Sequence, residues 1–360
     1  MKLFFFLSKV YLKNFLIILF ALTFSATLID ALQHFDSIEG FNRKVLYFFY
    51  IFEDFLFFVY PLALVFGAIS SFYQLITKNY LIAIYSFGYY PLAVLKPFIA
   101  ISLGVYFLFI GLDFTNFAYA NANAKAILSK SNKIDRLNDL FFKYNNSFVY
   151  VKALDSVEKR FYEGTLYYSK LFNNKKRLDS LIHFKSAKFQ NNYWVAREVE
   201  VKKIKYNKAG APVGYDRSFK KSLKILEGYY PKVIKLLYEG KRLSIYDGFR
   251  ALKLLNRQNI SNTKIVAALY NKIVMPLFAP FLIILIFLNL PIHKRFLNKA
   301  KFIIYSIGVT LISWAILYSF NMLSLNGAIN PHFGQPVVIL LLGLITLFML
   351  IKRKRDANRL

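Results

Sequence analysis

The chain has 360 residues, of which 57% are hydrophobic and 19% are charged, and its formal net charge is +29. The apolar share is too high for an ordinary soluble protein, and the absence of cysteine excludes disulfides and cysteine-ligated zinc or iron–sulfur centres. The positive charge fits a polyanionic partner such as anionic lipid or nucleic acid. A base-composition bias, visible in the richness in Phe, Tyr, Ile and Asn, is an alternative explanation.

Six apolar segments, each long enough to cross a membrane, dominate the chain. About 20 helical residues, rising about 1.5 Å each, cover a hydrocarbon core of about 30 Å. The first segment lacks a small-residue cleavage site, so we expect it to remain as a helix. The pattern predicts an α-helical polytopic membrane protein with six transmembrane helices. The segments are residues 10–32, 45–73, 92–118, 265–290, 302–325 and 333–351.

The lysines and arginines of the short flanks predict the orientation, because cytoplasmic loops carry an excess of these residues. Short loops on one side contain only Arg43 and Lys44. We therefore expect both termini in the cytoplasm and the long polar segment after the third span outside it. That segment is itself basic, but long translocated domains do not follow the rule. The side expected in the cytoplasm carries Lys2, Lys9, Lys13, Lys78, Lys96, Lys294, Arg295, Lys299, Lys301, Lys352, Arg353, Lys354, Arg355 and Arg359.

The segment 77–90, between the second and third spans, predicts a short amphipathic helix that ends at Gly88. We call it the coupling segment, because a helix placed there would transmit force from a cytoplasmic motor to the spans. An ordinary interfacial turn is the alternative. The candidate contact residues are Thr77, Lys78, Tyr80, Leu81, Ile84, Tyr85 and Gly88.

The polar insert, residues 121–263, predicts a separate β domain. Runs at 148–151, 161–168 and 193–201 are rich in β-branched and aromatic residues, and the last alternates apolar and polar side chains. Several short strands at this spacing indicate a sandwich, a jelly roll or a related open β domain. Breaks at 145–146, 173–174, 191–192 and 209–212 separate the runs.

A helix is predicted at 244–256, at the end of the insert, with Ile245, Phe249, Leu252 and Leu255 on one face. It would lead back to the membrane. We therefore divide the chain into spans one to three with the coupling segment, the insert, and spans four to six with the basic tail. These three parts cover residues 1–120, 121–263 and 264–360.

Ionisable residues in or near the spans are candidate functional sites, because a charge inside a membrane is costly. Asp30 and His34 are four residues apart near the outer end of span one, Arg43 and Lys44 precede span two, and Lys272 lies in the outer half of span four. These five residues, the cationic rim, would suit an anionic lipid head group. The alternative is that they pair inside the bundle or reach the interface. Glu53, Asp54 and Asp113 are further carboxylates within the predicted spans.

Motifs for enzymatic chemistry are absent from the sequence. It contains no G-x-x-x-x-G-K-[ST] and no H-E-x-x-H. No nucleophile and base have the spacing of a catalytic pair. We therefore expect a protein that is not an enzyme and that has no metal and no cofactor. A single-stranded nucleic acid site at 193–206 is disfavoured, because we expect that basic aromatic segment outside the cytoplasm. The four histidines are scattered: His34, His183, His293 and His332.

Several local patterns, in this order and topology, resemble the LptF/LptG family over essentially the whole chain. They are the Pro-containing run 60–68, the spacing of Leu81, Gly88 and Pro97, the strand 193–199 with its central Trp, the run 272–277 that opens span four, and the loop 327–331. Members of this family are the membrane subunits of the lipopolysaccharide-export ABC transporter of Gram-negative bacteria.

The resemblance implies a periplasmic β-jelly-roll domain and a heterodimer with a paralogous six-helix subunit in the inner membrane. It implies a cytoplasmic ATPase dimer below, a periplasmic bridge protein, and extraction of lipopolysaccharide from the outer leaflet of that membrane. The coupling segment departs from the family pattern: Tyr80 stands at the usual acidic position and Tyr85 at the usual arginine position. An aromatic contact would have to replace the electrostatic docking of the ATPase.

Two rival interpretations remain. A membrane-anchored receptor or scaffold would use the β domain to bind a ligand or partner. Such a receptor should carry a cytoplasmic output domain, whereas this chain has only short basic loops and tails on that side. An ABC permease of the lipoprotein-release type commonly has its large external domain between the first and second spans, not between the third and fourth.

Overall fold

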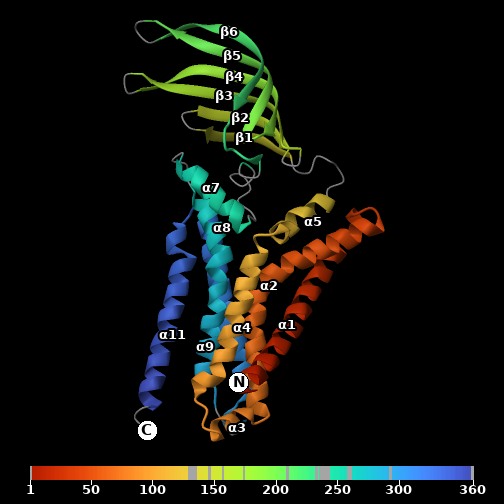
Figure 1. Cartoon of the computed structure of the whole chain (residues 1–360), viewed down its shortest axis with the longest axis vertical. Helices are drawn as coiled ribbons and strands as arrows, with labels where there is room; N and C mark the ends of the chain where they lie inside the picture. The colour runs from red at the N-terminus through yellow and green to blue at the C-terminus, as the bar shows by residue number, and fades with distance from the viewer. Residues whose placement is uncertain are drawn as a thin grey trace. The chain divides into compact units, whose positions relative to one another are not determined.

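A computed structural model describes most of the chain (Figure 1). The described residues are 2–128, 136–144, 147–155, 158–172, 175–207, 211–231, 234, 244–257, 262–291 and 294–357. The chain divides into two compact units. The membrane unit comprises Met1–Leu128, Arg242–Ile245 and Val266–Leu360, and the β unit comprises Ser129–Lys241 and Tyr246–Ile265. The predicted breaks at 145–146 and 173–174, residues 209–210 of the predicted break at 209–212, and His293 lie outside the described residues.

Among the described residues, six helices are long and apolar enough to cross a membrane, as predicted. Span four is interrupted where Pro276 enters the short 3-10 helix η3, Met275–Leu277, because proline has no N–H to donate within a helix. Figure 1 shows the spans as long ribbons. They are α1 (Lys2–His34), α2 (Phe41–Thr77), α4 (Pro91–Leu112), α8 with α9 (Thr263–Ile273 and Phe278–Leu288), α10 (Lys299–Leu325) and α11 (Gln335–Ala357).

Close packing of α1 on α2 forms the centre of this unit. A Cβ atom added to Gly67 would lie 2.8 Å from the Cα atom of Phe15, so only glycine permits this approach. Beside it, the Tyr11 hydroxyl donates to the Leu64 carbonyl at 3.0 Å, and the Tyr11 ring stacks on Phe98 of α4 at 4.8 Å. Dispersion contacts and small residues, not hydrophobic exclusion from water, hold such helices together in lipid.

Span three is shorter than predicted. Its helix ends at Leu112, and the chain turns into the 3-10 helix η2, Asn116–Tyr119, and then α5, Ala120–Leu128. The side chain of Thr115 accepts from the backbone N–H of Phe117 and so caps η2. Asp113 therefore lies just after the helix and not inside the span. The helix α5 packs against α2, where Ala124 joins a small buried cluster with Tyr47 and Ile51.

The β unit contains one curved six-stranded sheet, which confirms the predicted β insert between spans three and four. The predicted runs lie in β2, β3 and β5, while β1, β4 and β6 were missed. The strand order follows the chain, and every neighbouring pair is antiparallel (Figure 1). This is a meander in one sheet, whereas a jelly roll distributes Greek-key strands over two. The strands are Arg136–Tyr144, Ser147–Asp155, Arg160–Phe172, Lys175–Gln190, Tyr193–Tyr206 and Pro212–Ile225.

Trp194 is the centre of the sheet's core. Its indole is fully buried, stacks on Phe161 with 3.6 Å between ring centroids, and donates its Nε1–H to the Tyr229 carbonyl at 2.6 Å. A buried indole N–H requires such an acceptor. The core thus connects β3, β5 and the chain after β6.

The predicted helix near residue 250 is α7, Ile245–Arg257, but its predicted apolar face is partly wrong. Phe249 is 54% exposed, whereas Ile245, Ala251 and Leu255 are buried. The buried side also includes Gly248, so this helix packs through small residues and turns its large aromatic outward.

Candidate functional site

Three residues of the cationic rim come together where α1 ends and α2 begins. The Tyr47 hydroxyl donates to Asp30 Oδ1 at 2.5 Å, and His34 Nδ1 lies 3.4 Å from the same oxygen. Lys44 Nζ lies 5.8 Å from the centroid of the Phe35 ring. Asp30, His34 and Lys44 therefore surround one aromatic corner, and Arg43 beside them is exposed. Tyr47 was missed, because no sequence pattern connects it with Asp30.

Lys272, the fifth residue of the rim, takes part in a different buried constellation. Its Nζ donates to Asp113 Oδ1, and the two side chains are only 11% and 1% exposed. The ammonium also lies 4.9 Å from the centroid of the Phe57 ring of α2. Lys272 therefore fits the alternative interpretation, in which the ionisable residues pair inside the bundle. The Asp113 carboxylate balances its charge.

A further carboxylate in span two also has a partner. Asn121 Nδ2 of α5 donates to Asp54 Oδ2 at 3.1 Å. This bond ties α5 to α2. Together with the corner at Asp30, it concentrates polar groups where α1, α2 and α5 meet.

The coupling segment contains the predicted helix, α3, Tyr80–Ser86. Asn79 and Gly88, with φ of 58° and 78°, form its two ends in the left-handed region. Leu81 and Ile84 are buried, which anchors the helix to the spans. The Thr77 hydroxyl donates back to the Tyr73 carbonyl at 2.8 Å, and Lys78 caps the end of α2.

Aromatic side chains form much of the exposed surface of the coupling segment. Phe87 and Tyr90 are each 81% exposed, and Tyr80 makes an edge-to-face contact with Phe6 at 5.6 Å. Burial raises the pKa of the half-buried Tyr85 hydroxyl, and the Arg353 guanidinium of α11 opposes this shift. Tyr85 is therefore a neutral donor at physiological pH, and the segment presents mainly aromatic rings on its exposed surface.

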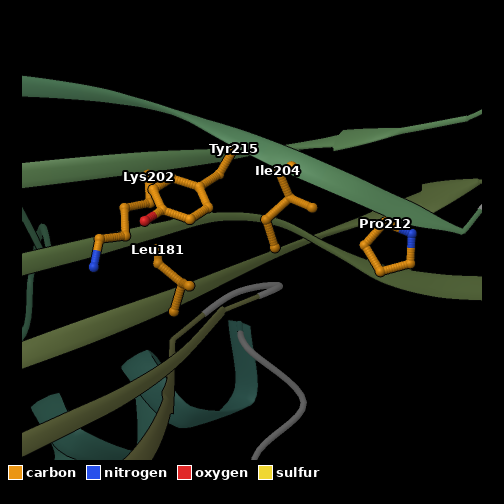
Figure 2. Close-up of a pocket in the computed structure, with 6 residues that line it drawn as sticks. Leu181, Lys202, Ile204, Pro212 and Tyr215 are labelled. Carbon is orange, nitrogen blue, oxygen red and sulfur yellow. The ribbon is translucent and has the colours of Figure 1, made fainter.

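In the β unit, an open hollow of about 410 Å³ lies over β4 to β6 (Figure 2). Leu181 and Ile204 form its apolar base, and Lys202 and Tyr215 lie beside them. Lys202 already interacts with Glu200 at 3.3 Å and with the Tyr215 ring at 5.7 Å. The paired ammonium makes this hollow a poor site for a second anion.

A family model described as lipopolysaccharide export system permease LptF/LptG matches residues 6–353. A search of curated proteins found no match. Within the described residues, no three His, Asp or Glu side chains converge as metal ligands would.

Proposed function

This chain belongs to the LptF/LptG family of lipopolysaccharide export permeases, and we propose that it extracts lipopolysaccharide from the outer leaflet of the inner membrane. The observation that supports this most strongly is the family match over nearly the whole chain, in a multi-pass inner membrane protein with a β domain inserted after the third span. In the proposal, both termini are cytoplasmic and the β unit is periplasmic.

Energy comes from a separate cytoplasmic ATPase dimer, and a paralogous six-helix subunit completes a heterodimer. Nucleotide binding closes the ATPase pair, which pushes on the coupling segment. The spans of the two subunits then close, and the lipid moves out of the cavity between them. The chain's own role is to bind, hold and release the lipid, since it has no phosphate-binding loop of its own.

A periplasmic bridge protein receives the lipid from the β unit. The edge strand β6 favours this step, because among the described strands it pairs on one side only, with β5, and its first eleven residues are exposed. An exposed strand edge pairs readily with a strand of another β protein.

Arg43 and Lys44, the accessible cations of the cationic rim, hold the phosphates of the lipid in this proposal. Replacing both with glutamate is expected to reduce co-purified lipopolysaccharide about thirtyfold, because juxtamembrane cations each contribute about 1 kcal/mol toward anionic lipid and about 1.4 kcal/mol is a factor of ten. The lipid is measured by mass spectrometry after detergent purification. Lys299 and Lys301, exposed at the start of α10, provide the matched control with the same charge change. Equal lipid recovery from both double variants would remove Arg43 and Lys44 from the site.

The coupling segment docks the ATPase through aromatic rings. We expect the recovered ATPase to remain bound when NaCl is raised from about 0.1 to 0.5 M, because apolar contacts are not screened by salt. Replacing Phe87 and Tyr90 with alanine should reduce its recovery about tenfold, since buried aromatics dominate interface energetics. Phe114, exposed beyond the other end of α4, is the control position for alanine. Loss of the ATPase in high salt from the unaltered chain would instead indicate ionic docking.

The experiment that tests the whole proposal is purification of the tagged chain from its native membrane, followed by mass spectrometry of proteins and lipids. We expect a P-loop ATPase, a second six-span paralogue and lipopolysaccharide. Recovery of the chain without an ATPase would contradict the transporter function and favour the receptor or scaffold class.

A further inference from the structure

The two stretches of chain that border the insert meet at one buried carboxylate. Asp113 follows the last residue of α4, and its Oδ2 accepts from the backbone N–H of Ile245 at 2.8 Å. Ile245 is the first residue of α7, so its N–H has no acceptor within the helix. Asp113 therefore caps α7 from 132 positions earlier in the chain.

A second hydrogen bond joins the same two stretches. The Tyr119 hydroxyl of η2 donates to Ser244 Oγ at 3.1 Å. Ser244, like Ile245, is buried. The outgoing chain at 113–119 and the returning chain at 244–245 are thus bonded to each other twice.

Lys272 connects this junction to span four. Its ammonium donates to Asp113 Oδ1, the carboxylate oxygen that the Ile245 N–H does not use. The Tyr106 hydroxyl of α4 also donates to the Ile273 carbonyl at 2.9 Å. Two consecutive residues of span four, Lys272 and Ile273, therefore contact α4 or the residue that follows it.

A buried ion pair contributes little net stability compared with an apolar pair, but it demands one geometry. We propose that Asp113, Lys272, Tyr119 and Ser244 form a neck clamp within the membrane unit, which fixes residues 244–245 against the chain that follows α4 and keeps spans three and four together during transport. The part of the clamp in transport rests on the proposed transport function; the anchoring does not. In this role Lys272 is a positioning residue, held away from the lipid phosphates by Asp113.

Two double variants of the full chain distinguish the contribution of the Asp113–Lys272 charges from that of the hydrogen bond by which Asp113 caps α7. Asp113→Asn with Lys272→Gln removes both charges but keeps a side-chain oxygen that can accept from the Ile245 N–H. Asp113→Lys with Lys272→Asp keeps one charge of each sign but places a donor where α7 needs an acceptor. Hydrogen exchange of the Ile245 amide is measured in the complex with its partner subunits, together with lipid transported per ATP hydrolysed.

In the reversed pair, Asp113→Lys with Lys272→Asp, the Ile245 amide is expected to exchange at least about tenfold faster than in the unaltered chain. In the neutral pair, Asp113→Asn with Lys272→Gln, its exchange rate should stay within about threefold of that in the unaltered chain. Transport per ATP should fall about fivefold or more in the reversed pair while ATP hydrolysis continues. Unchanged exchange in the reversed pair would overturn the clamp. Faster exchange with unchanged transport per ATP would overturn the part of the clamp in transport. If the unaltered complex moves no lipopolysaccharide, the transport function fails, and the exchange result still decides the anchoring.

A milder variant keeps the test usable if the reversed pair does not fold. Tyr119→Phe removes the hydroxyl that donates to Ser244 and should accelerate exchange at Ile245 about threefold, with a measurable loss of transport per ATP. The exposed pair Lys205–Asp216, whose atoms lie 2.6 Å apart, is the control: Lys205→Gln with Asp216→Asn should change neither readout, because exposed pairs contribute little. Equal behaviour of Tyr119→Phe and this control would overturn the part assigned to Tyr119.

Discussion

Replacing Trp194 with alanine is expected to destabilise the β unit strongly while the spans remain folded. The indole is fully buried, stacks on Phe161 and donates to the Tyr229 carbonyl. Its loss leaves a large cavity and an unpaired carbonyl, at a cost of about 3–5 kcal/mol. A domain has a stability of only about 5–15 kcal/mol, so this change removes a large part of it.

The measurement is hydrogen exchange of the β5 amides in the full chain in detergent, compared with exchange in α2. Phe219→Ala on β6 is the control, because that ring is 71% exposed and its loss should cost less than about 1 kcal/mol. If the β5 amides were equally protected from hydrogen exchange in both variants, Trp194 would not organise this core.

Replacing Gly67 with leucine is expected to separate α1 from α2 and to reduce the yield of folded protein about tenfold. The added side chain would begin 2.8 Å from the Cα atom of Phe15, and a backbone atom in a packed helix cannot move aside cheaply. Overpacking costs about 1–3 kcal/mol where side chains can adjust, and more where they cannot. Helix pairs in lipid depend on this close approach through small residues.

Thermal unfolding and yield of the detergent-purified chain measure this effect. Gly104→Leu on α4 is the matched control, since nothing lies within 4 Å of a Cβ atom built there. Similar melting temperatures for the two variants would mean that the α1–α2 contact at Gly67 is dispensable.

The spans and the presence of the β insert could be predicted from sequence because each depends on local composition. About 20 apolar residues specify a span wherever they occur, and the β-branched and aromatic residues at 193–201 specify a strand. Strand β6 was missed because its first eleven residues are exposed on both faces, so no period of two is visible. Phe249 was predicted to lie on the buried face because it is a large apolar residue, whereas the small residue Gly248 beside it was not considered.

The site required contacts that no local pattern contains. Lys272 was recognised as a costly charge in a span, but its partner Asp113 lies 159 positions away. Tyr47 joins Asp30 across the turn between two helices, again without a motif. The sequence could therefore identify which groups need a partner, whereas only the fold shows which partner each one has.

ATP-driven movement of lipid is the central claim, and reconstitution tests it most directly. The chain, its paralogue and the ATPase are placed in vesicles that contain lipopolysaccharide, and release of the lipid to a soluble β-bridge protein is followed with and without ATP. We predict release that requires both ATP and this chain. Release that is the same without ATP, or the same when this chain is omitted, would contradict the account.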